Sequence, residues 1–199
     1  MKKEHVKDFY FYKAKREKYS ARSVYKLKNI QEKYKVISKG NRVLDLGAAP
    51  GSWTEYLIEI LGRNGEIIAL DERPLSLTAQ RKIEKIGLKF RFLQQSVMDE
   101  LPEDIQNLDA VVSDLAPWTQ GPKLVDQMNS LVLVERAHAI ATKHLKKGGH
   151  FIVKIFQSEE AQKQVKLWEK EFKMAKLYKP PSTHKESKEI YFVGLHYTN

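Results

Sequence analysis

The chain has 199 residues, of which 42% are hydrophobic, so it is long enough for one domain with a substantial core and too apolar for wholesale disorder. It contains no cysteine, which excludes disulfide bridges, thiolate zinc sites and cysteine nucleophiles. Thirty-five Lys and Arg against 25 Asp and Glu leave a net charge of +10, which favours an acidic partner.

Much of the excess positive charge lies in residues 1–28, which hold ten Lys or Arg and three Asp or Glu and so carry +7. The same segment contains six aromatic side chains: Phe9, Tyr10, Phe11, Tyr12, Tyr19 and Tyr25. Such a mixture can bind phosphates and stack on unpaired bases. It can equally be a solvated basic helix whose aromatic side chains pack on the core, and composition does not separate the two interpretations.

The first residues favour a cytoplasmic location. They are charged and are not followed by the apolar segment of a signal peptide. No stretch of the sequence approaches the length of a membrane span. The absence of cysteine also suits a reducing compartment, and we therefore expect a cytoplasmic protein.

Residues 1–40 are expected to form a basic N-terminal extension, and residues 41–199 the main domain. The extension should contain a helix at residues 20–34, which Ser20 or Ser23 could cap. The inward face of this helix is expected to carry Val24, Leu27, Ile30 and Gln31.

From residue 42 onward, short β-rich runs alternate with segments of helical periodicity, which is the pattern of a parallel sheet covered by helices on both faces. The expected strands are 42–46, 66–70, 89–94, 109–113, 150–155, 174–178 and 190–197. The expected helices are 52–61, 75–86, 123–145 and 159–172. The last two strands are expected to form an antiparallel hairpin.

The helix at residues 123–145 has the clearest pattern, because apolar residues recur every three or four positions. Its expected apolar stripe consists of Leu124, Met128, Leu131, Val134, Ala137, Ile140, Ala141 and Leu145. The two lysines and two glycines at positions 146–149 are typical of the end of a helix.

The glycine-containing segment Gly47-Ala-Ala-Pro-Gly51 lies between a buried strand and a helix, where open α/β sheets bind ligands. Glycine lets the backbone approach a ligand closely, and the following helix offers unpaired N–H groups. The segment matches neither Gly-x-Gly-x-x-Gly nor a P-loop. Asp71 ends the next strand, 20 positions after Gly51, and its carboxylate can accept hydrogen bonds from both hydroxyls of a ribose. Loop and acid together predict an adenosine-containing cofactor.

The segment Asp45-Leu-Gly-Ala-Ala-Pro-Gly-Ser-Trp53 resembles the cofactor motif of the FtsJ/RrmJ family of RNA 2′-O-ribose methyltransferases. Four further segments resemble blocks of this family, in the family's order: 22–27, 113–117, 153–156 and 187–191. The resemblance implies an α/β class I methyltransferase fold, which is Rossmann-like, with a seven-stranded, mostly parallel sheet, helices on both faces and an antiparallel last strand. It also implies S-adenosyl-L-methionine as the cofactor.

The resemblance further implies a catalytic tetrad of Lys26, Asp114, Lys154 and Glu189 around the transferring methyl group and the target 2′-hydroxyl. A ribose hydroxyl must be oriented and must lose its proton as the new bond forms. We expect Lys154 to accept this proton and Asp114 to hold Lys154, while Lys26 and Glu189 position the substrate and the basic pair. A second lysine and partial burial favour a neutral Lys154, whereas Asp114 favours the ammonium, so its protonation state stays open.

For the cofactor, the resemblance implies contacts from Gly47, Gly51, Trp53, Asp71 and Asp114. The family usually has Gly-Asp after the third strand, where the carboxylate binds the adenine amino group, but this chain has Gln95-Ser96. Ser96 is therefore the expected contact, and Asp99 is the alternative. The six histidines show no ligand-like spacing, so no metal is expected.

The expected activity is methylation of a ribose 2′-hydroxyl in 23S ribosomal RNA, at a uridine of the large subunit, as in the bacterial proteins that the chain resembles. The expected partner is RNA, as free ribosomal RNA or as the large subunit. Methylation of a tRNA anticodon loop is the alternative within the class. A non-catalytic ribosome-assembly factor is disfavoured by the intact tetrad, and a small-molecule methyltransferase by the +7 charge of residues 1–28.

Overall fold

The computed structural model describes residues 9–117 and 123–199, with side chains except those of residues 123–127. The described residues contain a seven-stranded sheet with the strand order β3-β2-β1-β4-β5-β7-β6. Its strands are β1 (Arg42–Leu46), β2 (Glu66–Leu70), β3 (Lys89–Leu93), β4 (Leu108–Ser113), β5 (Leu145–Phe156), β6 (Phe172–Tyr178) and β7 (Glu189–Tyr197). β3, β2, β1, β4 and β5 pair in parallel, whereas β7 lies antiparallel between β5 and β6. The expected fold class and the antiparallel last strand are confirmed.

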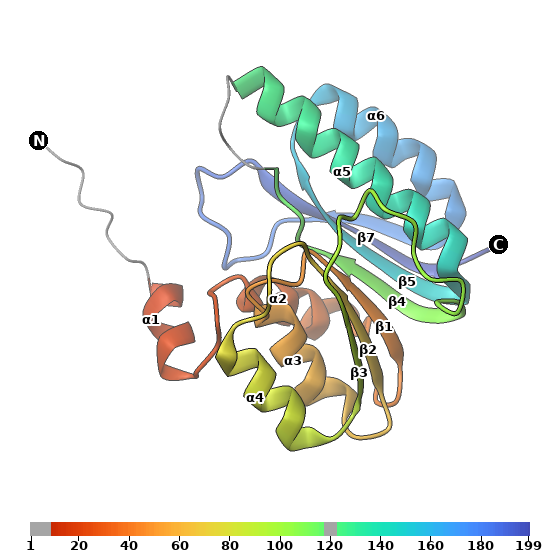
Figure 1. Ribbon diagram of the computed structural model, residues 1–199. Helices are drawn as coiled ribbons and strands as arrows, with labels where there is room; N and C mark the ends of the chain where they lie inside the picture. The colour runs from red at the N-terminus through yellow and green to blue at the C-terminus, as the bar shows by residue number, and fades with distance from the viewer. Residues whose placement is uncertain (1–8, 118–122) are drawn as a thin grey trace, which may run out of the picture.

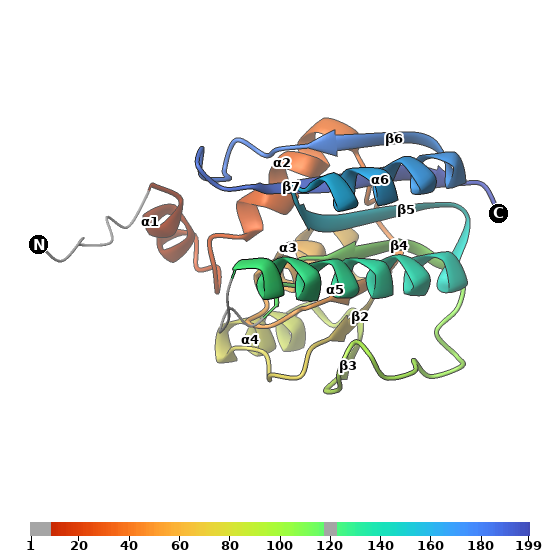
Figure 2. The same cartoon turned by 90° about the horizontal axis from the view of Figure 1, so that it is seen from above.

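Helices cover both faces of this sheet, as Figures 1 and 2 show. They are α1 (Phe9–Arg16), α2 (Val24–Tyr34), α3 (Ser52–Leu61), α4 (Leu77–Ile86), α5 (Lys123–His144) and α6 (Glu159–Trp168), and a 3₁₀ turn at Glu169–Glu171 follows α6. Helices α5 and α6 lie on one face, and α3 and α4 lie on the other. None of the described helices is long and apolar enough to cross a membrane.

The sheet divides the core in two, because successive residues of a strand point to opposite faces. Leu44 and Leu46 of β1 join the cluster that contains Ile140 of α5. Val43 of the same strand joins the cluster that contains Leu57 of α3. Both clusters consist of buried residues, so the sheet is packed on both faces and its strand ends carry the loops of the site.

The end of helix α5 differs from the sequence expectation. Leu145 does not continue the helix but pairs with Leu108 as the first residue of β5. Lys146 then forms an ion pair with Asp109 instead of capping the helix. Strand pairing with β4 therefore outweighs the helical pattern at this point. Val134, Ala137, Ile140 and Ala141 are buried as expected, whereas Met128 is 63% exposed and the side chain of Leu124 lies outside the described ones.

The described part of the N-terminal extension, residues 9–40, contains two helices, of which only α2 was predicted. Ser23 stands at the N-cap position of α2 but makes no side-chain cap, because its hydroxyl binds the Ser52 hydroxyl at 2.8 Å. Gln31 does not join the apolar core either. Its side-chain amide donates to the carbonyl of Ile37 and accepts from the N–H of the same residue, at 2.7 and 2.9 Å.

Candidate active site

The loop between β1 and α3 is shaped by its two glycines. Gly47 has φ +78°, and a Cβ there would lie 2.9 Å from Cδ2 of Leu115. Gly51 has φ +116°, and a Cβ there would lie 2.5 Å from the Cβ of Ala79 on α4. Other residues rarely adopt such backbone angles, so both positions require glycine. Gly47 lets the loop pass the segment after β4, and Gly51 lets α3 pack against α4.

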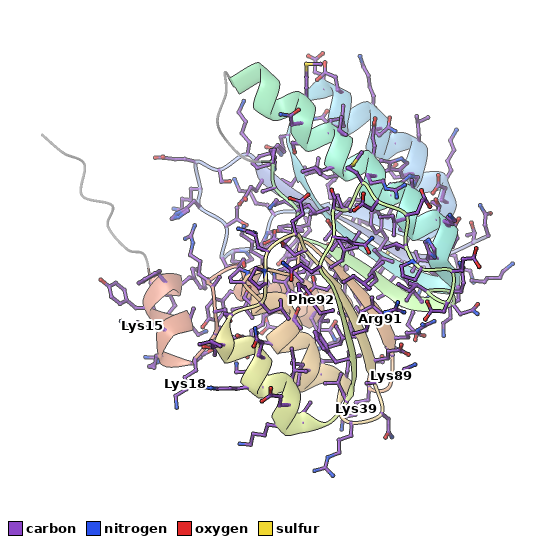
Figure 3. The ribbon with its side chains drawn as sticks, viewed as in Figure 1. Lys15, Lys18, Lys39, Lys89, Arg91 and Phe92 are labelled. Atoms are coloured by element: carbon purple, nitrogen blue, oxygen red, sulfur yellow. The ribbon has the colours of Figure 1, made fainter. Side chains whose placement is uncertain are left out.

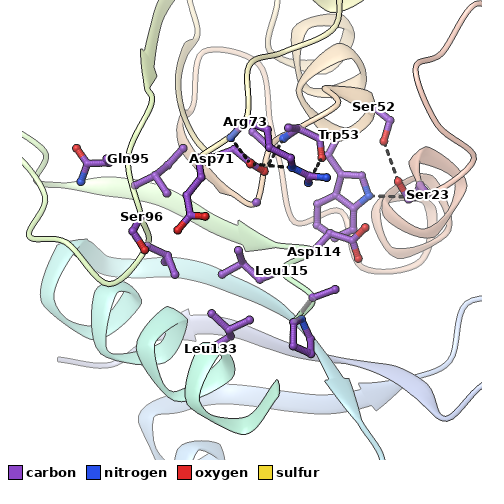
Figure 4. A pocket seen from close by; sticks show the side chains of 18 residues that line it. Ser23, Ser52, Trp53, Asp71, Arg73, Gln95, Ser96, Asp114, Leu115 and Leu133 are labelled. Carbon is purple, nitrogen blue, oxygen red and sulfur yellow. Dashed lines mark hydrogen bonds and ion pairs between the residues drawn. The ribbon is translucent and has the colours of Figure 1, made fainter. Parts of the chain in front are cut away.

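This loop forms one wall of a cavity of about 360 Å³ at the carboxyl ends of the parallel strands (Figure 4). Five of the six residues expected to bind the cofactor line it: Gly47, Trp53, Asp71, Ser96 and Asp114. The sixth, Gly51, is not among the lining residues, and its glycine requirement comes from Ala79. The cavity lies where open α/β sheets bind nucleotide-like ligands.

Asp71, at the end of β2, is 8% exposed and fixed by backbone groups. Its Oδ2 accepts from the N–H of Ala49 at 2.9 Å, and its Oδ1 accepts from the N–H of Arg73 at 2.9 Å. The guanidinium of Arg73 also lies 3.4 Å from Oδ1 and lines the same cavity. The carboxylate is therefore pre-positioned toward the cavity, as a ligand for a diol requires.

The conformation of the segment after β3 distinguishes between Ser96 and Asp99, the two candidates for contact with adenine. Ser96 lines the cavity, together with the apolar side chains of Val97, Leu115 and Leu133. Asp99 is not among the lining residues. Its Oδ2 instead accepts from the N–H of Ser96 at 3.1 Å, and thereby holds the turn that carries Ser96.

Trp53 lies opposite, where the N-terminal segment meets the cavity. Its indole N–H donates to the carbonyl of Ser23 at 3.0 Å, and its ring lies 5.9 Å from that of Tyr191. Ser23 and Ser52 also line the cavity, although the sequence did not single them out as site residues.

Two of the expected tetrad residues meet at the end of β4. The ammonium of Lys154, on β5, lies 3.2 Å from Oδ1 of Asp114 and donates to the carbonyl of Asp114 at 2.7 Å. Lys154 is 5% exposed, so its head group is held away from bulk solvent. Asp114 lines the cavity, which places the pair at its edge.

The other two tetrad residues form a second ion pair. Nζ of Lys26, on α2, lies 2.9 Å from Oε2 of Glu189, the first residue of β7. The side chains of both are largely shielded, at 12% and 20% exposure. The pairing links residues 163 positions apart in the chain, so only the fold brings them together.

Strand register relates the two pairs. Lys154 stands opposite Tyr191 on β7, and Glu189 is two residues before Tyr191. Paired residues and residues two apart project from the same face of a sheet. Lys154, Tyr191 and Glu189 therefore share the face on which α2 carries Lys26.

Tyr191 is a further site residue that the sequence did not single out. It is fully buried, and its hydroxyl donates to Oδ1 of Asp114 at 2.7 Å. Burial, with the neighbouring Asp114 carboxylate, raises the pKa of Tyr191 well above its ordinary value, so the hydroxyl keeps its proton. The alternation of a strand could have indicated this residue, since it lies on the same face as Glu189.

Asp45 is a buried carboxyl beneath the loop. It is 1% exposed and accepts a hydrogen bond from the Thr54 hydroxyl at 2.7 Å through Oδ2, while no described group hydrogen-bonds Oδ1. Burial raises its pKa to about 7, against the hydrogen bond from Thr54, and the charges of Asp114 and Asp71 raise it further. Among the described residues, no group of three or more His, Asp or Glu side chains could hold a metal ion.

The sheet order, the glycine loop after β1 and the acid at the end of β2 define a protein of the class I methyltransferase fold. The family model of the FtsJ-like methyltransferases matches residues 19–197. The chain belongs to this family.

Individual relatives agree with the family match. A protein of Syntrophobacter fumaroxidans named ribosomal RNA large subunit methyltransferase E is 40% identical, over 96% of this chain and 95% of that protein. A protein of the same name from Desulfatibacillum aliphaticivorans is 42% identical over 188 residues, covering 94% and 89%.

Solved structures show the same fold at lower identity. A ribosomal RNA methyltransferase, described as putative, from Plasmodium falciparum has a TM-score of 0.74 at 23% identity and covers 91% of this chain and 100% of that chain. The fibrillarin/Nop5p complex contains a chain with a TM-score of 0.62 at 20% identity, covering 87% and 83%. At these identities the likeness supports the fold alone.

Proposed function

We propose that this protein transfers a methyl group from S-adenosyl-L-methionine to a ribose 2′-hydroxyl of 23S ribosomal RNA. The observation that carries the proposal is the Lys154–Asp114 pair, held by Tyr191 at the edge of the cavity. The names of the relatives with about 40% identity support ribosomal RNA of the large subunit as the substrate, and with it a cytoplasmic location.

The cavity has the donors and acceptors that the cofactor requires. Asp71 would accept the ribose hydroxyls, and Ser96 with Val97 and Leu133 would hold the adenine ring. The backbone of Gly47 and the carboxylate of Asp114 would contact the amino-acid part. When bound, the cofactor supplies a sulfonium methyl group as the electrophile.

Lys154, held by Asp114, would accept the proton of the target hydroxyl. Asp114 holds the lysine head group by two contacts, one to its carboxylate and one to its carbonyl. We propose that Lys154 accepts the hydroxyl proton as the oxygen–carbon bond forms, after loss of its own proton to solvent. Asp114 orients it and stabilises the resulting ammonium.

The pair Lys26–Glu189 would position the RNA. The ammonium of Lys26, on α2, can contact a backbone phosphate or a ribose oxygen. Oε2 of Glu189, 2.9 Å from Nζ of Lys26, holds the ammonium in place. Residues 1–40 would extend this contact as part of the RNA-binding surface, and residues 41–199 would form the catalytic domain. The +7 charge of residues 1–28 supports this division.

The decisive experiment uses radiolabelled cofactor with large subunits that lack 2′-O-methylation, free 23S RNA and tRNA, followed by mapping of the labelled ribose. The protein is expected to label 23S RNA, free or in the subunit. The Lys154→Met variant should transfer methyl at least about 100-fold more slowly, which is the lower range for loss of a general base, while it still binds S-adenosylhomocysteine.

Lys147→Met is the matched control, because Lys147 lies on the same strand with an exposed side chain. It should methylate RNA like the parent protein. Label on tRNA alone would contradict the proposed substrate, and absence of label on every RNA would contradict the proposed activity.

A further inference from the structure

The aromatic residues of the N-terminal segment divide into two groups. Tyr10, Tyr19 and Tyr25 pack with the buried side chains of Ala14 and Val24. Phe9, Phe11 and Tyr12 of α1 are 68%, 37% and 60% exposed. The two interpretations of this segment, core packing and a surface for bases, thus apply to different residues.

The two most exposed rings, those of Phe9 and Tyr12, lie on one side of α1. Residues three, four and seven positions apart share a face of a helix, so Phe9, Tyr12 and Arg16 form one outer stripe. Lys15 is exposed beside it, and Figure 3 shows Lys15 and Lys18 near α1, at the end of the molecule away from Lys89. The opposite side of α1 carries Tyr10 and the buried Ala14.

Ring contacts hold this stripe against the domain. The ring of Phe9 lies 5.4 Å from that of Tyr10 in an edge-to-face arrangement, and Tyr10 lies 5.3 Å from Tyr25. Tyr25 in turn is buried on α2. The ring of Phe9 is therefore backed by inner rings, which reduces the entropy that binding would cost, whereas the ring of Tyr12 lies edge-to-face against that of Phe11 at 5.6 Å.

The segment that follows α1 is held on one face of α3 by hydrogen bonds. Ser52, Glu55 and Glu59 follow one another along this face at spacings of three and four. Ser52 binds the Ser23 hydroxyl at 2.8 Å, and Glu59 accepts from the hydroxyl of Tyr19 at 2.7 Å. Between them, Glu55 is fully buried and accepts from the backbone N–H of Ser20 at 3.1 Å, and Lys82 lies 3.4 Å from it.

The attached segment also connects α1 to the cavity along the chain. Ser23, which ends the attached segment, lines the cavity. In Figure 2, α1 lies at the same end of the molecule as the loop between β6 and β7 and the start of α5. A ligand that crosses α1 can therefore continue toward Asp114 and Lys154.

We propose that the outer face of α1 is a stacking platform for unpaired nucleobases of the RNA that flanks the methylated ribose. Phe9 and Tyr12 offer ring faces, and Lys15 and Arg16 neutralise the adjacent phosphates. Charge complementarity selects a polyanion, and exposed rings select unpaired bases, because every base has a π-face that can stack. The inference rests on the proposed function only for the identity of the RNA.

The test compares binding of a fluorescent single-stranded 12-mer RNA with that of a duplex of the same length, across a salt series and without cofactor. Phe9→Ala/Tyr12→Ala is expected to lose roughly fivefold or more in affinity for the single strand, the low end for loss of one stacked base. Its affinity for the duplex and its salt dependence should stay unchanged. Lys15→Gln/Arg16→Gln should weaken binding to both RNAs and lower the salt slope by about 1.4 for the single strand.

Leu167→Ala/Met174→Ala is the matched control, since both side chains are exposed apolar residues elsewhere, at 60% and 49%. It should bind both RNAs like the parent protein. The circular dichroism and thermal midpoint of every variant should match the parent, because the replaced side chains lie at the surface.

Equal loss on single strand and duplex, or no loss in the aromatic variant, would overturn the proposal. The proposal would also be overturned if the aromatic variant lost binding to anionic phospholipid vesicles but kept its binding to RNA, because that result would assign the face to a membrane surface. These outcomes are independent of catalysis, because the same measurement works in the Lys154→Met background. Failure to methylate any RNA would therefore reject the proposed function and leave the platform to be judged by binding.

Discussion

The buried carboxyl of Asp45 makes the stability of the domain depend on pH in a direction opposite to that of most acids. Its pKa of about 7 in the folded protein lies above the ordinary value of 3.8. Between these values the folded state holds a proton that the unfolded chain releases. The contribution of Asp45 to stability is therefore most favourable below pH 4, declines as the pH rises to 7, and is constant above.

The size of the effect follows from the pKa difference. One pKa unit corresponds to about 1.4 kcal/mol, so the full window from 3.8 to about 7 amounts to about 4 kcal/mol. Between pH 5 and pH 8, the part that lies in the window is roughly 2–3 kcal/mol. No reduction for solvent screening applies, because the carboxyl is 1% exposed.

The Asp45→Asn variant removes this titration while it keeps the shape of the side chain. We expect its free energy of unfolding, relative to the parent protein, to rise by about 2–3 kcal/mol from pH 5 to pH 8. Urea denaturation of both proteins at pH 5, 6, 7 and 8 measures the difference. Glu103→Gln is the control, since Glu103 is exposed, and its difference from the parent should stay flat. Parallel curves for Asp45→Asn and the parent would refute the assignment of a raised pKa to Asp45.

Three further substitutions test the site. Gly51→Ala places a Cβ 2.5 Å from that of Ala79 at φ +116°, and it should lower the free energy of unfolding by about 2 kcal/mol or more in chemical denaturation. Gly87→Ala, whose Cβ would meet nothing within 4 Å, is the control and should lower it by about 1 kcal/mol. Equal losses of stability would contradict the packing argument. Asp71→Ala should weaken binding of S-adenosylhomocysteine by about tenfold or more in calorimetry, because a charged acceptor is lost, and an unchanged Kd would exclude Asp71 as a cofactor ligand. Tyr191→Phe removes the hydroxyl that donates to Oδ1 of Asp114 at 2.7 Å, so methyl transfer should slow by about fivefold or more while cofactor binding is retained. An unchanged rate would show that Asp114 is held by Lys154 alone.

The alternation of strands and helices was readable from the sequence because each element is defined by a local period of apolar residues. The residues at which helices and strands begin and end were harder to predict from the sequence. Leu145 fits the helical stripe of α5, yet it begins β5, because pairing with Leu108 of a distant segment decides its conformation. Helix α1 was missed for the same reason, since Tyr10 on its inner face packs against the ring of Tyr25 on α2, which no local pattern specifies.

The candidate site shows the same division. Motifs indicated Asp71 and Ser96, and both line the cavity. Gly51 was expected to line it too, but its conformation is required by Ala79, which lies on another helix. Ser23 and Tyr191 belong to the site through contacts with Trp53 and Asp114, from which they are separated by 30 and 77 positions.

By itself, the sequence determined the α/β class, the position of the glycine loop and the residue types at the site, since these depend on composition, local periodicity and motifs in chain order. Only the tertiary structure decided which of these residues meet. The ion pairs Lys154–Asp114 and Lys26–Glu189 join strands and a helix across 40 and 163 positions. Such contacts depend on strand order and register, which arise from packing the whole core and are not encoded in any one segment.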